Sequence, residues 1–287
     1  MKMYYCDSDN FGDALNRYIF KKCFNVEVER TDTWAAESLG IGSIMENLLW
    51  QVKDILKPHK IKLFNINNPV KIFSSGFGRD SQSYRTKPRF FKSMIFKRKI
   101  EVVSLRGELT RKQIAEIDKN IDLSRCVLGD MGLLSSYLLD GKRSEKSYEL
   151  GCAPHGGERN HPVFDRIMKE NPGSVILDTR GDPVEFLKKL DKCKAVISTG
   201  MHPLIAADSL GIPNMWCRIS EFNTPRHKYY DYYSIYPVDM EPVSLLTEKV
   251  SKKRVVDEYK IKYEWVQDIK NNLYSHHKTY FENRKTV

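Results

Sequence analysis

Residues 195–217 have the sequence AVISTGMHPLIAADSLGIPNMWC. The apolar and β-branched run at 195–198 predicts a short buried strand, and residues 203–210 predict a helix. Residues 214–217 predict a second strand. A strand, a helix and a strand in such close succession favour parallel pairing through a right-handed crossover, which is the repeating unit of open α/β sheets.

The same alternation occupies most of the chain. Residues 2–6 predict a strand, and the turn-forming residues 7–12 lead into a helix that we expect to begin at Asp13 and to end near Phe24. Repeated units of this kind predict an α/β fold with parallel sheets. Further strands are predicted at 70–74, 100–104, 126–128, 150–153 and 175–178, and further helices at 43–56, 107–117, 130–139, 163–170 and 183–192.

A polar stretch without periodicity, residues 140–148, separates two halves of similar pattern. A length of 287 residues also suits two domains, which we expect at residues 1–140 and 149–255. Residues 256–287 carry an apolar stripe at helical spacing. They predict one long helix that packs on the domains, because the stripe is too short for a coiled coil. The stripe consists of Tyr259, Tyr263, Val266, Ile269 and Leu273.

The chain carries 47 Lys and Arg against 37 Asp and Glu, a net charge of +10, which favours an anionic partner. Seven basic residues, three Phe and no acid lie within residues 85–99. This segment is either a solvated loop or a contact for an anionic membrane, where each basic residue contributes about 1 kcal/mol. No nucleic-acid recognition motif accompanies the charge, and no nucleic-acid partner is expected.

No apolar stretch approaches the roughly 20 residues of a membrane-spanning helix, and the N-terminus lacks the apolar core of a signal peptide. We therefore expect a cytoplasmic protein, which residues 85–99 could hold at the inner face of the plasma membrane. The six cysteines form no C-x-x-C pair and no acidic loop has metal-binding spacing. Neither a disulfide scaffold nor a metal site is predicted.

Open parallel sheets bind ligands beyond the carboxyl ends of their strands, so polar and glycine residues at those positions are candidates for a site. His202 and His155 suit proton transfer, because imidazole titrates near neutrality, although a packed or capping histidine is the alternative. Arg106, just before a helix, could clamp a carboxylate or phosphate, or form a surface ion pair. The remaining candidates are Asn10, Gly12, Asp13, Gly76, Phe77, Asp130, Gly200 and Met201.

Several segments together resemble one family. The N-terminal motif Asn10–Asp13, the block Leu105–Thr110 and the block Leu128–Leu134 match its motifs in order. The segment Val196–Asp208 and the late acidic-aromatic block Tyr230–Tyr233 also match. Together with Gly42–Ile44, Ser75–Phe77, Pro154–His155 and Gly211–Asn214, these segments make the chain similar to the polysaccharide pyruvyl transferases.

This resemblance implies two Rossmann-like domains that face a central cleft, as in GT-B glycosyltransferases, with the first domain on the acceptor side. It implies transfer of pyruvate from phosphoenolpyruvate to two hydroxyls of a sugar or lipid-linked oligosaccharide, which forms a cyclic ketal in capsule or exopolysaccharide biosynthesis. No cofactor is implied, since phosphoenolpyruvate is the donor substrate. Arg106 matches the family's donor-binding Arg and His202 matches its active-site His.

The chain departs from the family at Gly200, where Arg or Ser often stands. This departure keeps a catalytically silent saccharide-binding protein as an alternative. A nucleotide-sugar glycosyltransferase of similar architecture is the other alternative. For the transfer itself, we expect His202 to act as acid or phosphate partner and Arg106 as anion clamp. Asp13 or Asp130 is expected to orient a hydroxyl or to support the structure.

Overall fold

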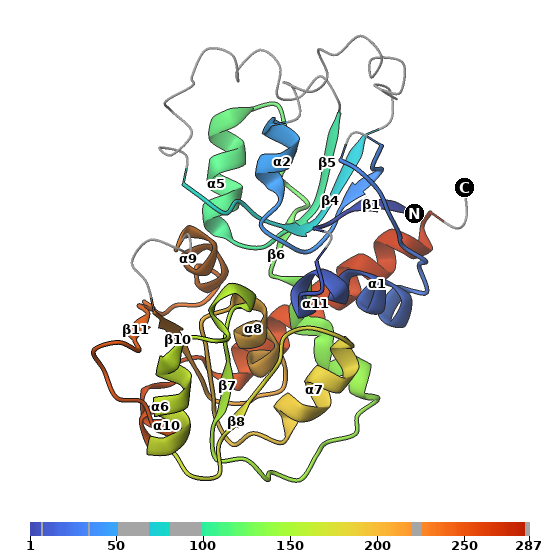
Figure 1. The fold of residues 1–287 in the computed structure, drawn as a ribbon. Helices are drawn as coiled ribbons and strands as arrows, with labels where there is room; N and C mark the ends of the chain where they lie inside the picture. The colour runs from blue at the N-terminus through green and yellow to red at the C-terminus, as the bar shows by residue number, and fades with distance from the viewer. Residues whose placement is uncertain (7, 34, 51–68, 81–98, 220–225, 285–287) are drawn as a thin grey trace.

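The computed structural model describes residues 1–6, 8–33, 35–50, 69–80, 99–219 and 226–284 (Figure 1). Nearly all of the basic segment 85–99 lies outside these residues, as does the second half of the helix predicted at 43–56. Within the described part of the chain, no helix is both long and apolar enough to cross a membrane.

The first half of the chain forms a six-stranded sheet with the order β2-β1-β3-β4-β5-β6, in which neighbouring strands run parallel. The α/β prediction is confirmed for this half. β2 and β3 were not predicted, because they have two residues each and lack the apolar run that predicted β6. The strands are β1 (Lys2–Tyr4), β2 (Glu29–Arg30), β3 (Ser38–Leu39), β4 (Val70–Ser75), β5 (Ile100–Leu105) and β6 (Val127–Leu128).

The second half forms a five-stranded parallel sheet with the order β11-β10-β9-β7-β8. In both sheets the first strand lies between the second and the third. This is the flavodoxin-like strand order, and it differs from the 3-2-1-4-5-6 order of dinucleotide-binding sheets. The strands are β7 (Gly151–Ala153), β8 (Val175–Ile176), β9 (Val196–Ser198), β10 (Asn214–Arg218) and β11 (Val243–Ser244).

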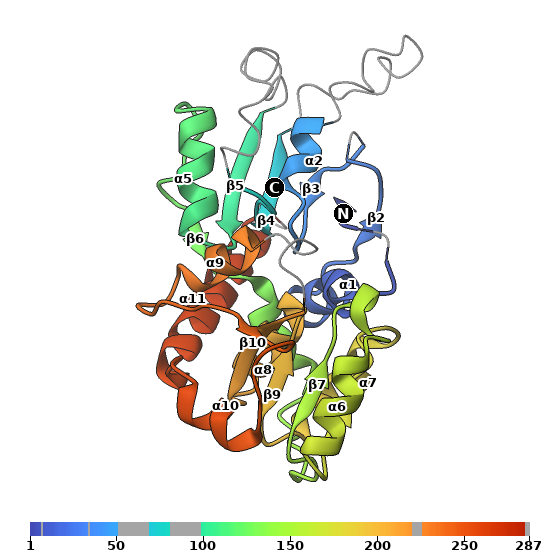
Figure 2. The ribbon, with the colours of Figure 1, turned by 60° about the vertical axis from the view of Figure 1, so that its left-hand side comes forward.

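Helices cover both sheets and also fill the space between them (Figures 1 and 2). Around the first sheet lie α1 (Phe11–Phe24), α2 (Met45–Trp50), α5 (Glu108–Ile117) and the 3-10 helix η3 (Met131–Leu139). Around the second lie η4 (Gly156–Glu158), α6 (Pro162–Glu170), α7 (Pro183–Asp191), α8 (Met201–Ser209), α9 (His227–Tyr233), α10 (Lys252–Glu258) and α11 (Tyr263–Glu282).

Helix α1, from the first half of the chain, packs against helix α7 of the second half. The ring of Phe11 packs on the ring of Phe186 in α7, with centroids 4.3 Å apart. The hydroxyl of Tyr18 donates a hydrogen bond to Asp182, the N-cap of α7, over 2.7 Å. One continuous hydrophobic cluster therefore runs from the first sheet through α1, η3, α7 and α8 to the second sheet.

Two helix boundaries differ from the prediction. α1 begins at Phe11 rather than at Asp13, because Asn10 has extended backbone and its side chain accepts a hydrogen bond from the amide of Gly12 at 3.0 Å. Asn10 thus does the capping that was assigned to Asp13. The predicted helix at 130–139 is a 3-10 helix that starts after the capping residue Asp130.

The C-terminal region differs as well. One long helix was predicted from residue 256, but α10 and α11 are separate helices, and Tyr259 lies between them with extended backbone. Its hydroxyl donates to the buried carboxyl of Asp208 at 2.7 Å. α11 then crosses to the first half, where the ring of Phe281 contacts those of Phe20, Phe24 and Phe73.

Replacing Phe281 by leucine should lower the free energy of unfolding by about 1–2 kcal/mol, since leucine keeps the burial but loses three aromatic contacts. Urea unfolding followed by circular dichroism measures the loss. Val256→Ala, at a side chain that is 46% exposed, is the control and should stay near the wild-type value. An unchanged midpoint for Phe281→Leu would show that α11 docks through other contacts.

Candidate functional site

The strand order places a topological switch point in each sheet, which is the place where the connections from two neighbouring strands lead to opposite edges. The chain leaves β1 toward one edge of the first sheet and β3 toward the other, and β7 and β9 diverge in the same way in the second sheet. Loops that follow diverging strands leave a crevice in which ligands bind. All four loops here border one cavity of about 160 Å³. Its lining consists of Cys6, Asn10, Asp13, Gly42, Ser43, Pro154, His155, Thr179, Gly200, Met201, His202, Pro203 and Lys228.

His202 lies in the first turn of α8, directly against the start of α1. A Cβ atom placed on Gly12 would lie only 1.8 Å from Nδ1 of His202, so the imidazole occupies the space that any other residue would need at position 12. The other ring nitrogen, Nε2, is buried and has no hydrogen-bond partner in the part of the chain that the structure describes. Burial, with lesser contributions from Lys228 and Arg106, lowers the pKa of His202 to about 3. The imidazole is therefore neutral at physiological pH.

Lys228, in the first turn of α9, supplies a cation to the cavity. Burial lowers its pKa most, and the charge on Arg106 lowers it further. Asp13 and Glu158 act to raise the pKa. The result is a pKa of about 8, so the ammonium group is mostly charged at pH 7. Lys228 was not among the predicted residues, because it follows no strand and lies within a helix.

Asp13 and His155 face the cavity from opposite halves. Burial raises the pKa of Asp13 to about 6, against the lowering effects of a hydrogen bond from Ser8 and of the charge on Lys228. His155 is held by its backbone amide, which donates to the hydroxyl of Thr199 at 2.8 Å. Its pKa is lowered, first by burial and then by Lys228. The cavity thus holds a cation, a carboxyl group and two imidazoles.

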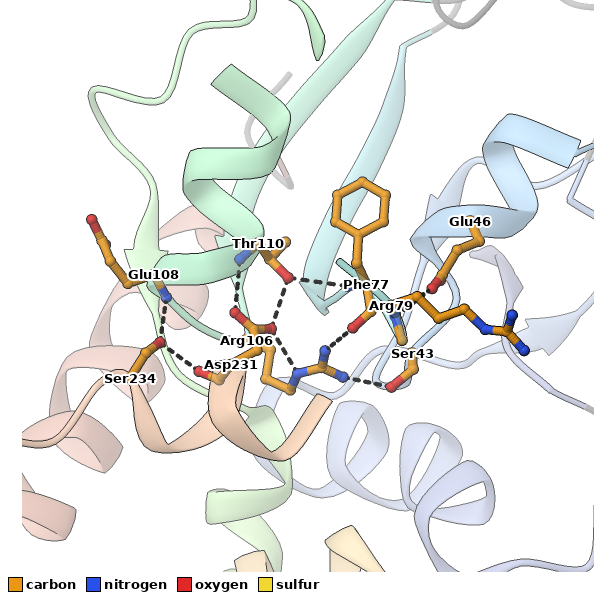
Figure 3. A network of polar contacts seen from close by, with 10 residues as sticks. Ser43, Glu46, Phe77, Arg79, Arg106, Glu108, Thr110, Asp231 and Ser234 are labelled. Carbon is orange, nitrogen blue, oxygen red and sulfur yellow. Dashed lines mark hydrogen bonds and ion pairs between the residues drawn. The ribbon is translucent and has the colours of Figure 1, made fainter. Parts of the chain in front are cut away.

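Arg106 lies beside the cavity rather than in its lining. The side chain is 0% exposed and its Nε donates to Asp231 at 2.8 Å (Figure 3). One terminal nitrogen donates to the hydroxyl of Ser43 at 2.7 Å, and the other donates to the carbonyl of Phe77. A Cβ on Gly76 would lie 2.4 Å from the guanidinium carbon, so Gly76 packs directly against that group.

Asp130 is also outside the lining. Its Oδ1 accepts a hydrogen bond from the amide of Gly132 at 2.8 Å, and its Oδ2 is buried with no hydrogen-bond partner among the described residues. Burial is the main reason that its pKa rises to about 6. This carboxyl group caps η3.

The structure therefore brings six predicted residues to one cavity, and a seventh, Gly12, to its wall. Arg106, Gly76, Phe77 and Asp130 form the layer behind it. The lining residues that were not proposed as site residues are Cys6, Gly42, Ser43, Pro154, Thr179, Pro203 and Lys228.

Two parallel sheets with a shared cavity at their switch points define an α/β protein with a small-molecule site between its halves. The family model for polysaccharide pyruvyl transferase matches residues 10–221, which include every lining residue except Cys6 and Lys228. The chain belongs to the polysaccharide pyruvyl transferase family, as the sequence motifs predicted.

Two curated relatives extend this result. The chain is 23% identical over 227 residues to the succinoglycan biosynthesis protein ExoV of Rhizobium meliloti, and the match covers 77% of this chain and 60% of that protein. It is 30% identical over 124 residues to the uncharacterized protein L143 of Acanthamoeba polyphaga mimivirus, which covers 42% of this chain and 43% of that protein. The matches thus span less than two thirds of either relative.

Proposed function

We propose that the protein transfers pyruvate from phosphoenolpyruvate to two hydroxyls of one sugar, as a cyclic ketal, in surface polysaccharide biosynthesis. The single observation that carries the proposal is the cavity at both switch points, where Lys228, Asp13 and His202 meet. Family membership supports the reaction class. The two parallel sheets, each built from alternating strands and helices, support a GT-B-like assignment. In this assignment residues 1–140 form the acceptor domain and residues 149–255 form the donor domain.

The donor carries a carboxylate and a phosphate, so its site needs positive charge. Lys228 supplies a cation, and the first backbone amides of α8 point a helix N-terminus at the same cavity. Gly200 occupies the N-cap position of α8. The absence of a side chain there leaves these amides open to an anionic oxygen. We assign to Lys228 the positive charge that the family resemblance leads us to expect from an arginine at position 200.

The chemistry needs one acid and one base. An acid protonates the methylene carbon of the enol, and a sugar hydroxyl adds to the resulting oxocarbenium carbon. A second hydroxyl then displaces phosphate and closes the ring. Asp13, with a pKa of about 6, is assigned as the acid, and the carboxylate it leaves accepts the proton of the second hydroxyl. His202, neutral because its pKa is about 3, is assigned as the base that takes the proton of the first hydroxyl, whose oxygen becomes strongly acidic on addition, and that proton then leaves with the phosphate.

The acceptor is assigned to the first half. Asn10, Asp13 and Ser43 line the cavity from the loops after β1 and β3, and their oxygens and amide suit hydroxyl groups. A volume of about 160 Å³ is below the roughly 300–1,000 Å³ of typical ligand pockets, which suits a three-carbon donor better than a whole saccharide. The rest of the sugar or lipid-linked oligosaccharide therefore lies outside the cavity.

Calorimetric titration with phosphoenolpyruvate, followed by an assay of phosphate release with a panel of pyranosides, tests the proposal. Saturable binding and acceptor-dependent release are expected. Binding of a nucleotide diphosphate sugar without phosphoenolpyruvate would instead indicate a glycosyltransferase. Binding of saccharide alone would indicate a silent member of the pathway.

Donor affinity should depend on pH through Lys228. Below about pH 8 its ammonium form attracts the donor, and above that pH the neutral amine does not. The association constant for phosphoenolpyruvate should therefore fall above pH 8, by up to about tenfold per pH unit. The donor's own phosphate, with a second pKa near ~6, titrates at the lower end of the range and is almost fully ionised above pH 8, where the fall is expected. Calorimetry from pH 6.5 to 9.5 measures the curve, and a flat profile would remove Lys228 from donor binding.

A further inference from the structure

Helix α11 runs from the second half of the chain to the first sheet and passes beside β6 (Figure 1). A groove of about 800 Å³ lies between this helix, the first residues of β5 and the loop that leads into β6. Its volume falls within the roughly 300–1,000 Å³ of typical ligand pockets. The groove is therefore large enough for a ligand that the smaller cavity at the switch points cannot enclose.

One wall of the groove is a polar stripe on α11. Its residues form two rows with a spacing of four residues, so the side chains share one face of the helix. The stripe covers eleven residue steps, or roughly 16 Å at 1.5 Å per residue. Each of its six side chains can form hydrogen bonds. The stripe consists of Asn272, Ser275, His276, Thr279, Tyr280 and the C-cap residue Asn283.

The opposite wall presents two carboxylates in fixed positions. One terminal nitrogen of Arg284 donates to both oxygens of Glu101, over 3.0 and 2.7 Å. Oδ1 of Asp122 accepts a hydrogen bond from the amide of Ser124 at 2.9 Å. A carboxylate has about four lone-pair sites, so each of these groups can still accept hydrogen bonds from a ligand.

Tyr280 supplies a donor to the same groove. Its ring meets those of Phe73 and Phe281 edge to face, and the guanidinium group of Arg284 lies 4.6 Å from its centroid. Burial, and then the charge on Glu101, raise the pKa of the phenol, so it keeps its proton. The buried phenol oxygen has no hydrogen-bond partner of good geometry in the described part of the chain. A ligand oxygen in the groove could accept its proton.

We propose that this groove binds an uncharged oligosaccharide and holds part of the acceptor chain outside the cavity. Sugar hydroxyls donate to Glu101 and Asp122 and accept from Tyr280 and from the carboxamides of the stripe. Ile100 and Val102 offer an apolar surface to the C–H groups of the sugar ring. The role in acceptor binding rests on the proposed function, whereas saccharide binding by itself does not.

The lining favours a polyol over an anion or a peptide. The described residues of the lining hold two carboxylates and one arginine, Arg125, so a phosphorylated ligand would meet more negative than positive charge. An extended peptide is usually recognised through pockets for its side chains. Here the apolar lining is limited to Ile100 and Val102 in the described part of the chain.

The groove and the cavity lie at opposite ends of β5. The groove contacts its first three residues, whereas Arg106, just after its last residue, donates to Ser43 in the cavity lining. The six residues of β5 span roughly 16 Å at about 3.3 Å per residue, so one sugar ring cannot occupy both sites. A longer chain held in the groove raises the local concentration of its reacting sugar.

Glycan binding is tested without phosphoenolpyruvate on an array of gluco-, galacto- and manno-oligosaccharides, both uncharged and acidic, and quantified by calorimetry. Thr279→Trp places an indole in the groove. Asn271→Trp, at an exposed position of α11 outside the lining, is the matched control. Asn272→Ala removes one carboxamide from the stripe. Histidine NMR locates the glycan, because His276 lines the groove and His202 lines the cavity.

Wild type and Asn271→Trp should bind the same uncharged oligosaccharides with equal affinity. Thr279→Trp should bind them at least about tenfold more weakly, and Asn272→Ala about threefold to tenfold more weakly. The NMR signal of His276 should shift on glycan addition in Asn271→Trp but not in Thr279→Trp. If Thr279→Trp does not fold, the affinity of Asn272→Ala and the shift of His276 in wild type still decide.

The effect on transfer should depend on acceptor length. In Thr279→Trp the KM for a polymeric acceptor should rise at least about fivefold with kcat unchanged, because the loss is one of binding. The KM for a monosaccharide acceptor should equal that of wild type. Asn271→Trp should match wild type with both acceptors.

A wild-type protein that binds no glycan on the array, equal binding by Thr279→Trp, or a shift of His202 in place of His276 would overturn the groove as a saccharide site. A preference for acidic glycans would overturn the assignment of an uncharged ligand. Glycan binding in the groove without phosphate release from phosphoenolpyruvate would overturn the proposed function alone. Phosphate release with an unchanged KM for the polymer in Thr279→Trp would overturn the acceptor role of the groove alone.

Discussion

Replacing Lys228 by methionine should weaken phosphoenolpyruvate binding about 100-fold, or about 2.7 kcal/mol. Methionine keeps most of the length and apolar character of the lysine stem but removes the ammonium group. Among the described residues that line the cavity, Lys228 is the only lysine or arginine, so its loss leaves the donor's carboxylate and phosphate with polar and backbone partners alone in that part of the chain. Removal of one partner from a desolvated charged contact typically costs 2–5 kcal/mol.

Calorimetric titration at pH 7 measures this loss. Lys169→Met, at an exposed position of α6, is the matched control for the change in net charge, and it should bind the donor as wild type does. Lys228→Arg should recover part of the affinity, because the charge stays while the head group becomes larger. Wild-type affinity in Lys228→Met would mean that the donor is held elsewhere.

Replacing Gly12 by alanine should reduce transfer about 100-fold or more by displacing His202. The new Cβ would lie 1.8 Å from Nδ1, 2.3 Å from Cγ and 2.5 Å from Cε1 of the ring, and no real structure tolerates such contacts. The imidazole must therefore rotate away or push α1 and α8 apart. Forced repacking of this kind costs about 1–3 kcal/mol of stability, and it moves the proposed base from its place.

Three measurements separate these effects. Phosphate release should fall in Gly12→Ala to the level of His202→Ala, the histidine NMR signal of His202 should shift, and urea unfolding should show the modest loss of stability. Gly156→Ala is the control, because a Cβ there meets nothing within 4 Å. Wild-type turnover in Gly12→Ala would mean that the position of His202 is unimportant for the reaction.

Local pattern found the strands that lie in apolar runs but not those without one. Strands such as β4 and β5 have six residues each and were predicted within one or two residues. Of the two-residue strands, β6 and β8 were predicted because both residues are apolar, whereas β2, β3 and β11 each contain a polar residue and carry no period. Asn10 and Asp13 are both good capping residues. Only the backbone of Asn10, which is extended, shows which one starts α1.

The site residues also separate into those that the sequence pattern predicted and those that it did not. Residues that follow strands, such as His155, Gly200 and His202, were found because parallel strands deliver their carboxyl ends to one edge. Lys228 escaped notice because it lies within α9 rather than in a loop after a strand. α9 is joined to the first half by the hydrogen bond between Arg106 and Asp231, which are 125 residues apart in sequence, and no local pattern encodes a contact of that range.

The hydrophobic cluster that runs through α1, η3, α7 and α8 has a further consequence. The two halves do not behave as interchangeable modules, because each one ends in an apolar surface that the other half covers. A chimera that joined residues 1–140 of this chain to the second half of a distant relative would have to repack the contact between Phe11 and Phe186. Substrate range in this chain is therefore more open to change through the loops around the cavity than through exchange of whole halves.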